Sequence, residues 1–240
     1  MLPPKRWMVG RDRDTDRSML ERFVQNLYWA QDMPVADAKR SLEQGLLTVH
    51  ERLPPRDGLT MVGQGNGLLI TDDGYFLTAA HCLATSLGAR VRTSAGIWYD
   101  VLPGRVNYGS EDLVLAKADI PKRPAARVYR LGLDGCLKEG AVEVVSRKDS
   151  GVRRKYGVLN PSGLGGSYVR WSEGGLEEFP NHFSLLYPGQ RGDSGSIVVD
   201  PQAYLLGFIS GGNEELRTGT ACRTSAALNL VHAYLRMLRS

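Results

Sequence analysis

The chain has 240 residues, of which 42% are hydrophobic and 23% charged, a composition typical of a folded globular protein rather than a disordered one. Its 30 lysines and arginines exceed its 26 aspartates and glutamates by only four, which gives little indication of nucleic-acid or membrane binding. No apolar stretch approaches the roughly 20 residues needed to cross a bilayer. The N-terminus also lacks the apolar segment of a secretory signal. We therefore expect a cytoplasmic protein whose partners include neither nucleic acid nor membrane.

The three cysteines, Cys82, Cys136 and Cys222, are odd in number and widely spaced. This pattern argues against a secreted domain built on disulfides, and the sequence has no CxxC pair that would indicate zinc. We expect reduced thiols, no metal ion and no other cofactor.

Residues 1–58 are predicted to form a helical N-terminal extension that ends in a linker. The stretch Ser18–Glu21 has the pattern of a capping box, and apolar residues then recur at helical spacing. The same periodicity resumes after Pro34 and continues to Leu53, which predicts a second helix. The stretch Leu53–Gly58, with two prolines and a glycine, interrupts the pattern and is interpreted as the linker.

Residues 59–240 have the pattern of antiparallel β-structure, because short apolar runs alternate with Gly, Asp, Asn and Ser. The clearest runs are Gly67–Thr71, Tyr75–Thr78, Ala89–Thr93 and Ala141–Val145. A final helix is predicted because four apolar residues share one helical face: Leu228, Val231, Leu235 and Leu238. The basic stretch Arg147–Lys155 lies among turn-forming residues and is expected to be a solvated loop rather than a nucleic-acid site.

Three segments carry the residue types of a hydrolytic site. His81 ends the predicted strand of LTAAHC, Asp112 begins the strand of DLVLAK, and Ser194 lies in the turn GDSGS before another strand. A serine hydroxyl is a weak nucleophile unless an imidazole accepts its proton, and a carboxylate can orient that imidazole. Each residue alone is better explained as structural, but the three together favour catalysis. The remaining histidines, His50, His182 and His232, are interpreted as structural or surface residues.

With these three motifs, residues 62–240 resemble the chymotrypsin/trypsin-fold serine peptidases. The resemblance implies an all-β fold of two six-stranded antiparallel barrels with a C-terminal helix, preceded here by the helical extension. Residues 59–240 would be the peptidase domain, with the catalytic cleft between its barrels. Gly192 and Ser194 would supply the backbone N–H groups of the oxyanion hole.

Within this resemblance, the chain is similar in character to bacterial peptidases of the HtrA/Deg or stand-alone kinds. An HtrA enzyme would add a PDZ domain after the peptidase, whereas this sequence stops at Ser240. We therefore expect a stand-alone peptidase domain.

Two features of secreted trypsins are missing from the sequence. Asn66 stands where those enzymes have the cysteine that pairs with the one after the catalytic histidine, so Cys82 is expected to lack a local partner. The stretch that would supply their cleaved N-terminus, Ala38–Leu42, falls in a predicted helix. Asp193 would then lack the usual ammonium partner, and a basic side chain or a bound protein would have to order the oxyanion turn.

The resemblance also implies where substrate binds. The segment that would pair with the substrate backbone is Ser210, Gly211 and Gly212. Pro188 corresponds to the base of the primary specificity pocket, so a preference for Lys or Arg is not supported from that position. Arg191 is expected at the rim of the pocket.

We therefore predict a serine endopeptidase that cuts protein or peptide substrates through an acyl-enzyme. Its N-terminal extension could bind a partner, pack against the barrels or inhibit the site, and partner binding or packing is favoured. Activity would then be controlled by a regulatory protein rather than by zymogen cleavage. Two alternatives stay open: a catalytically inactive scaffold that binds peptides, and an esterase that uses the same triad.

Overall fold

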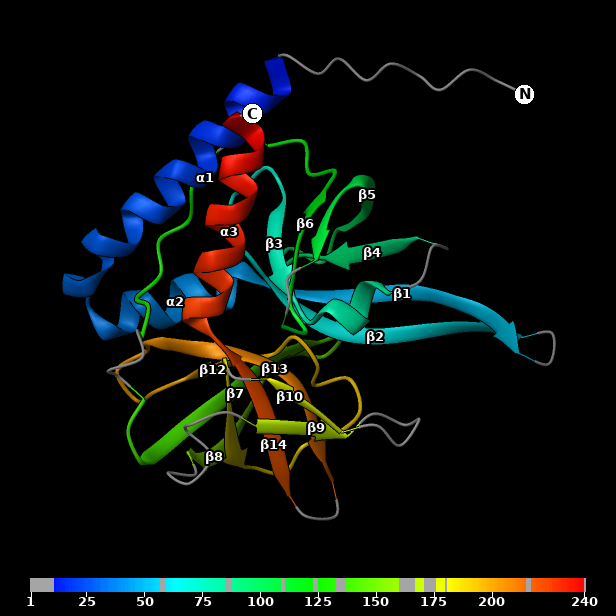
Figure 1. The fold of residues 1–240 in the computed structure, drawn as a ribbon, viewed down its shortest axis with the longest axis vertical. Helices are drawn as coiled ribbons and strands as arrows, with labels where there is room; N and C mark the ends of the chain where they lie inside the picture. The colour runs from blue at the N-terminus through cyan, green and yellow to red at the C-terminus, as the bar shows by residue number, and fades with distance from the viewer. Residues whose placement is uncertain are drawn as a thin grey trace.

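The structure is a computed structural model that describes residues 11–56, 59–84, 88–108, 111–122, 125–132, 137–159, 167–170, 176–179, 181–214 and 217–239. This part of the chain contains two closed β-barrels, with the helices gathered beside them (Figure 1). The predicted fold class, two six-stranded antiparallel barrels with terminal helices, is confirmed.

The first barrel has the strand order β1-β2-β3-β6-β5-β4. Its strands are β1 (Leu46–Arg56), β2 (Leu59–Leu69), β3 (Tyr75–Thr78), β4 (Ala89–Arg92), β5 (Trp98–Tyr108) and β6 (Val114–Ala118). The hairpin of β1 and β2 is long and projects beyond the rest of the barrel (Figure 1). A short 3-10 turn, η2 (Ala80–Leu83), follows β3 directly.

The second barrel has the order β11-β14-β13-β12-β7-β8. Its strands are β7 (Gly140–Lys148), β8 (Gly151–Leu159), β11 (His182–Leu186), β12 (Ile197–Val199), β13 (Leu205–Asn213) and β14 (Thr218–Arg223). A separate small sheet pairs β9 (Ser167–Arg170) with β10 (Leu176–Phe179).

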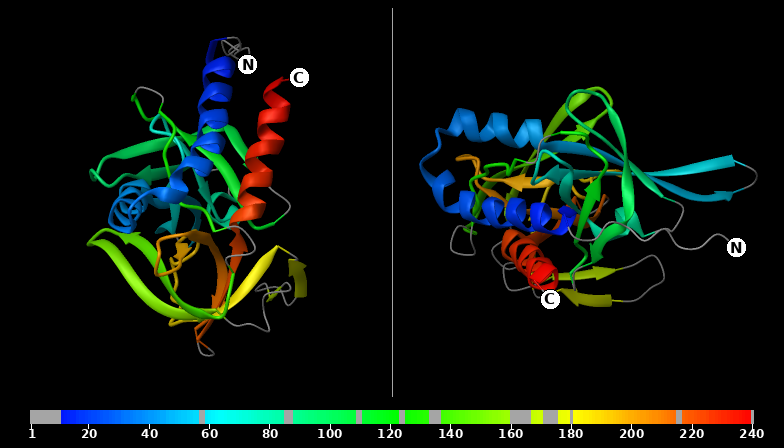
Figure 2. Two further views of the ribbon diagram at one scale, coloured as in Figure 1. Left: turned by 90° about the vertical axis from the view of Figure 1, so that its left-hand side faces the viewer. Right: turned by 90° about the horizontal axis from the view of Figure 1, so that it is seen from above.

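Three helices complete the fold: α1 (Arg11–Trp29), α2 (Val35–Gly45) and α3 (Thr224–Arg239). A 3-10 turn, η1 (Ala30–Asp32), joins α1 to α2. The first and last helices lie side by side, as both views in Figure 2 show. Among the described helices, none combines the length and the apolar character needed to span a bilayer.

The helical prediction for residues 46–53 was wrong, because this segment is the first barrel strand, β1. Four consecutive residues, Leu46–Val49, are buried, so both faces of the strand are covered and the alternation typical of a half-exposed strand is missing. The predicted linker was also wrong where it is described, because Arg56 pairs with Leu59 in the β1–β2 hairpin. The helical extension therefore ends at Gly45, and α1 already includes Arg11, seven residues before the predicted cap.

The basic stretch Arg147–Lys155 is not a loop, since it spans the end of β7, a two-residue turn and the start of β8. Its two strands are paired in register from Gly140↔Leu159 to Lys148↔Gly151. We call this segment, Arg147–Lys155, the basic hairpin.

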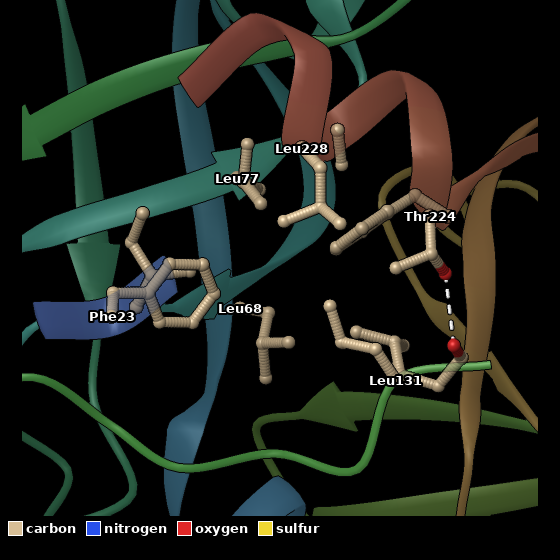
Figure 3. Close-up of a pocket in the computed structure, with 10 residues that line it drawn as sticks. Phe23, Leu68, Leu77, Leu131, Thr224 and Leu228 are labelled. Atoms are coloured by element: carbon tan, nitrogen blue, oxygen red, sulfur yellow. Dashed lines mark hydrogen bonds between the residues drawn. The ribbon is translucent and has the colours of Figure 1, made fainter. Parts of the chain in front are cut away.

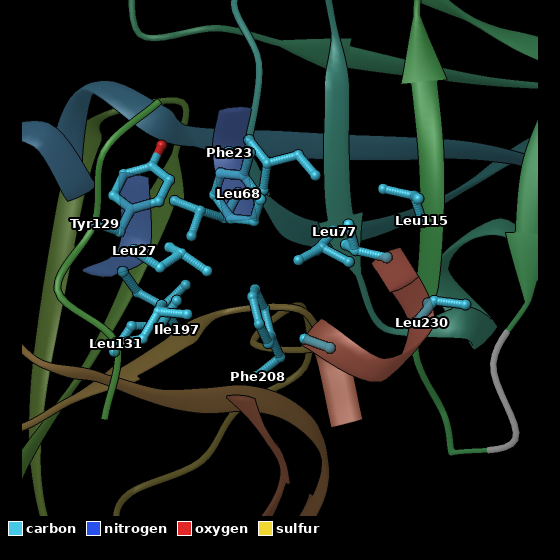
Figure 4. Packing of buried hydrophobic residues seen from close by; sticks show 14 of the residues in the cluster. Phe23, Leu27, Leu68, Leu77, Leu115, Tyr129, Leu131, Ile197, Phe208 and Leu230 are labelled. Atoms are coloured by element: carbon cyan, nitrogen blue, oxygen red, sulfur yellow. The ribbon is translucent and has the colours of Figure 1, made fainter. Parts of the chain in front are cut away.

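The main hydrophobic core lies where the two barrels meet the helices. Phe23 and Leu27 of α1, Leu68 of β2, Phe208 of β13 and Leu230 of α3 pack in one cluster (Figure 4). Both terminal helices are therefore part of the folded core rather than appendages to it, which favours the packing role predicted for the extension. The second and third clusters fill the interiors of the first and second barrels.

A small void remains inside this core, between Phe23, Leu77 and Leu228 (Figure 3). Its volume is about 10 Å³ and its lining is almost entirely apolar. The nearby Thr224 hydroxyl is satisfied by a 2.8 Å bond to the carbonyl oxygen of Leu205. A space of this size holds at most about one water molecule, so it is a packing defect and not a ligand site.

Candidate active site

A cleft of about 390 Å³ contains most of the predicted site residues. Its lining includes His81 from the first barrel and Ser194 with its neighbours from the second. The other predicted residues that line it are Arg191, Gly192, Ser210, Gly211 and Gly212. The fold therefore brings together segments that lie more than a hundred positions apart in the sequence.

His81 and Asp112 form a close pair between η2 and the start of β6. The ring nitrogen Nδ1 of His81 lies 2.7 Å from Oδ2 of Asp112, and the backbone N–H of His81 donates to Oδ1 at 3.0 Å. The aspartate side chain is only 5% exposed, whereas the imidazole is 35% exposed and can reach a substrate. Two contacts to one carboxylate fix both the position and the orientation of the imidazole.

The surroundings of His81 change its affinity for a proton. Burial of the imidazole disfavours the charged form, but hydrogen bonding and charge interactions with Asp112 and Cys82 outweigh burial and raise the pKa of His81 to about 10. The imidazolium is thus strongly stabilised. That is the form a general base reaches after it accepts a proton.

Ser194 lies in a tight turn whose backbone requires glycine at two positions. Gly192 has φ +81° and Gly195 has φ +74°, both in the left-handed region. A Cβ atom at Gly195 would come within 1.9 Å of the carbonyl oxygen of Asn66. The Gly195 N–H bonds to the carbonyl oxygen of Ile209 at 2.7 Å, which anchors the turn to β13.

The backbone N–H and carbonyl groups of Gly192 and Ser194, the predicted oxyanion donors, differ in their hydrogen bonding. Within the described ranges, no hydrogen-bond acceptor is paired with the N–H of Gly192 or of Ser194. The adjacent carbonyl groups, in contrast, are occupied. The carbonyl oxygen of Gly192 accepts from Asn66 Nδ2 at 2.7 Å, and that of Ser194 accepts from the Asn66 N–H at 2.7 Å.

Asp193 has a basic side chain where an activated trypsin has an N-terminal ammonium. Lys155 Nζ lies 2.5 Å from Asp193 Oδ2, and Lys148 Nζ lies 3.7 Å from Oδ1. The same Oδ2 accepts the backbone N–H of Gln190 at 2.9 Å. The expected substitute for the ammonium is therefore a pair of lysines from the basic hairpin.

Pro188 does not occupy the position predicted for it. It is exposed and does not line the cleft, whereas its neighbours Tyr187 and Gly189 do. The Tyr187 ring is 3% exposed, and a Cβ atom at Gly219 would come within 2.1 Å of it. The residue that closes the base of this part of the cleft is thus Tyr187. Sequence reasoning missed it because Tyr187 follows the end of β11, where no strand alternation indicates which side chain turns inward.

A buried hydrogen-bond network surrounds Glu111, the residue before Asp112. His182 is fully buried, and its Nδ1 lies 3.0 Å from Oε2 of Glu111. Asn181 donates to the other oxygen of Glu111 at 2.7 Å. His182 is therefore structural, as predicted, and it steadies the segment that carries Asp112.

The remaining polar clusters and thiols do not form a metal site in the part of the chain that is described. No group of three His, Cys, Asp or Glu side chains comes together there in a way that could hold an ion. Cys82 and Cys222 are buried free thiols, and Cys136 lies outside the described residues.

Two six-stranded barrels that enclose such a cleft define the chymotrypsin fold, the fold of a large class of serine endopeptidases. A family model for the trypsin-like peptidase domain matches residues 65–226, and the chain belongs to this family. The family predicted from the three motifs is thereby confirmed, and with it the assignment as a serine-type endopeptidase. No match was found among curated protein sequences.

Solved structures of proteases share this fold. The active form of the Rv3671c protease from M. tuberculosis aligns with a TM-score of 0.59 and 16% identity, over 84% of each chain. The serine endoprotease from Yersinia pestis aligns with a TM-score of 0.60 and 18% identity, over 85% of this chain and 67% of that one. The HtrA-type protease AlgW with a tripeptide aligns with a TM-score of 0.65 and 17% identity, over 85% of this chain and 64% of that one. At these identities the likeness establishes the fold alone.

Proposed function

We propose that this peptidase hydrolyses peptide bonds with His81, Asp112 and Ser194 as its catalytic triad. The observation that carries the proposal is the buried Asp112 carboxylate, which holds the His81 imidazole at 2.7 Å in the cleft that Ser194 also lines. In an ordinary surface pair of histidine and carboxylate, the carboxylate would not have to be buried or to accept the backbone N–H of the histidine as well.

The proposed reaction has two halves. Ser194 Oγ attacks the substrate carbonyl carbon while His81 Nε2 takes the hydroxyl proton, and Asp112 stabilises the resulting imidazolium. The carbonyl oxygen becomes an oxyanion that the N–H groups of Gly192 and Ser194 stabilise. His81 then gives its proton to the leaving amine, and an acyl-enzyme is left. In the second half, water attacks the acyl carbon and gives a proton to His81. His81 returns this proton to Ser194 Oγ as the bond between Oγ and the acyl carbon breaks, which releases the carboxylic acid product and the free serine.

The substrate is proposed to bind as an extra strand along Ser210, Gly211 and Gly212. β13 pairs with β14 along one edge, with a bulge between Ile209 and Gly211. On the other edge, its ladder with β12 runs only to Phe208. The segment after the bulge lines the cleft and can therefore offer backbone groups to an extended peptide.

The base of the cleft favours a small, uncharged substrate side chain before the scissile bond. The Tyr187 ring fills the space over Gly219 and also contacts Gly189, where a Cβ atom would lie 3.2 Å from the ring. Burial raises the pKa of the Tyr187 hydroxyl, with a further contribution from Asp193, so this residue stays neutral. A large or charged side chain would have to displace the ring or lose its solvation without a partner.

We also propose control by a regulatory protein, but not through the helix faces that pack on the core. The faces of α1 and α2 that pack on the core include Leu20, Phe23 and Leu42 and are not available to a partner. A partner would have to bind the outward faces of these helices. Cleavage before the barrel is not needed to supply an ammonium, since Lys155 already pairs with Asp193.

Turnover of matched substrates tests this function against the two alternatives. Purified wild type and Ser194→Ala would be given a peptide library and a set of activated esters. Peptide cleavage by wild type alone is expected, with acyl-enzyme visible by rapid-quench mass spectrometry. Ester hydrolysis without peptide cleavage would favour the esterase, and binding without any turnover would favour the scaffold.

A further inference from the structure

We propose that Lys155 and Lys148 are positioning residues that hold the oxyanion turn, Gln190–Gly195, in its catalytic conformation in the uncleaved chain. The proposal rests on the function above and adds to it the device that replaces proteolytic activation. Neither lysine is among the residues that line the cleft, so both act through Asp193 and Gly192.

Both side chains of the Lys155–Asp193 ion pair are buried. The lysine side chain is 9% exposed and the aspartate 3%, and Nζ lies 2.5 Å from Oδ2. That oxygen also receives the N–H of Gln190 at 2.9 Å, and the Asp193 N–H donates to the carbonyl oxygen of Gln190 at 3.1 Å. Asp193 thus closes the turn on itself while Lys155 neutralises its charge. Without that cation, a buried carboxylate would draw water in or leave its position.

Lys148 acts on the neighbouring peptide group. Its Nζ donates to the carbonyl oxygen of Gly192 at 2.5 Å, and Asn66 Nδ2 donates to the same oxygen at 2.7 Å. Two donors on one carbonyl fix the orientation of Gly192, whose N–H is a proposed oxyanion donor. The ammonium of Lys148 also lies 3.7 Å from Oδ1 of Asp193, so it contributes to both contacts.

The two lysines lie on the basic hairpin, which contacts the end of α2. Arg154, the neighbour of Lys155, forms ion pairs with Glu43 of α2 and Glu143 of β7. Arg147, the neighbour of Lys148, donates to the carbonyl oxygens of Leu46 at 3.1 Å and Glu43 at 3.2 Å. Adjacent strand residues point to opposite faces, so the hairpin contacts the end of α2 with one face and the oxyanion turn with the other. Its position is therefore set by the intact N-terminal segment that zymogen cleavage would alter.

The experiment compares wild type with Lys155→Met, Lys155→Arg and Lys148→Met, and with Lys122→Met as the matched control at an exposed lysine. Methionine keeps most of the chain length but removes the charge. We expect Lys155→Met to lower kcat for a peptide substrate about 100-fold, as the loss of an oxyanion donor does, with little change in KM. Lys155→Arg should restore most of kcat, and Lys122→Met should match wild type. The value of kcat is calculated per folded molecule, because a loss of folded protein would also lower the apparent kcat at unchanged KM.

Hydrogen exchange of the turn gives a second readout that does not depend on catalysis. Amides of residues 189–196 are expected to exchange faster in Lys155→Met and Lys148→Met, while those of α3 stay protected. Exchange of the turn unchanged from wild type, or a kcat of Lys155→Met within threefold of wild type, would overturn the proposal. If wild type proves inactive on every substrate, the proposed function fails, and exchange alone still decides whether the lysines hold the turn. If Lys155→Met does not fold, the comparison of Lys148→Met with Lys122→Met carries the same decision.

Discussion

Asn66 of the first barrel donates a 2.7 Å hydrogen bond from Nδ2 to the carbonyl oxygen of Gly192 in the second. Its Oδ1 accepts the N–H of Arg147 at 2.8 Å, and its own carbonyl oxygen accepts from Thr78 Oγ1 at 2.5 Å. The side chain is fully buried. Where secreted trypsins have a cysteine, this chain has an amide that joins β2, the basic hairpin and the oxyanion turn.

We expect Asn66→Ala to lower both stability and activity. The change leaves the N–H of Arg147 without its buried acceptor, which costs about 1–3 kcal/mol, and it removes one of the two donors on Gly192. Thermal unfolding and kcat would be measured together. The control is Asn26→Ala, because the Asn26 amide makes only a 3.5 Å bond to the carbonyl oxygen of Ala126. Equal effects at the two sites would contradict the role given to Asn66.

The pKa of His81 predicts the acid side of the pH profile. Because the pKa is raised to about 10, the imidazole keeps its proton above the ordinary value of 6.5, and kcat/KM should rise with pH as the neutral base form appears. Asp112→Asn removes the carboxylate that stabilises the imidazolium, so the pKa should fall. NMR titration of His81 in the Ser194→Ala background measures both proteins without self-cleavage. A pKa of His81 at or below 6.5 in the Ser194→Ala protein that keeps Asp112 would contradict the stabilisation of the imidazolium.

Substitution of Tyr187 should change the cleavage preference. Tyr187→Ala opens the space over Gly219, so substrates with large apolar side chains before the scissile bond should gain kcat/KM relative to those with alanine. A difference of one methylene group in such a pocket is worth about 10- to 200-fold. A peptide library profiled with both proteins measures the shift. Pro188→Ala is the matched control, because Pro188 is exposed and should leave the profile unchanged.

An ion cluster joins α1 to the first barrel and predicts that the extension is needed for stability. Lys117 Nζ lies 2.6 Å from Asp16 Oδ1 and 2.9 Å from Asp73 Oδ2, and the Asp16 side chain is 1% exposed. Burial lowers the pKa of Lys117, but the two carboxylates outweigh burial and raise it above its ordinary value. The stability that this raised pKa supplies is full below the ordinary value of 10.5 and is lost only as pH rises through the folded value.

Lys117→Met would leave two carboxylates buried beside an apolar side chain. Breaking a buried pair in this way costs about 3–5 kcal/mol, so we expect a large fall in the denaturant midpoint. Lys122→Met, at an exposed lysine, should change the midpoint little.

Deletion of residues 1–45 should destabilise the domain further, since it removes Leu20, Phe23 and Leu42 from the core. A folded, fully stable truncation would show that the helices are separable.

The features that could be predicted from the sequence are those that depend on short local patterns of residues. The motifs around His81, Asp112 and Ser194 each combine a strand or turn with a reactive side chain. The place of His81 and Ser194 in the cleft, and the contact of Asp112 with His81, could therefore be expected. β1 could not, because Leu46–Val49 are buried on both faces of the strand and the spacing of its apolar residues also fits a helix. The Lys155–Asp193 pair joins residues 38 positions apart. Only the barrel closure that sets β8 beside the turn brings them together, so sequence reasoning predicted a basic partner without naming it.

The most direct test of this account is covalent labelling of the purified, uncleaved protein with a fluorophosphonate. We expect one phosphonate per chain, mapped to Ser194 by peptide mass spectrometry, and no labelling of Ser194→Ala or of denatured wild type. Labelling should need no added protein and no cleavage of the N-terminal segment, because Lys155 already holds Asp193. Absence of labelling in the folded wild-type protein, or labelling only after N-terminal cleavage, would contradict the account.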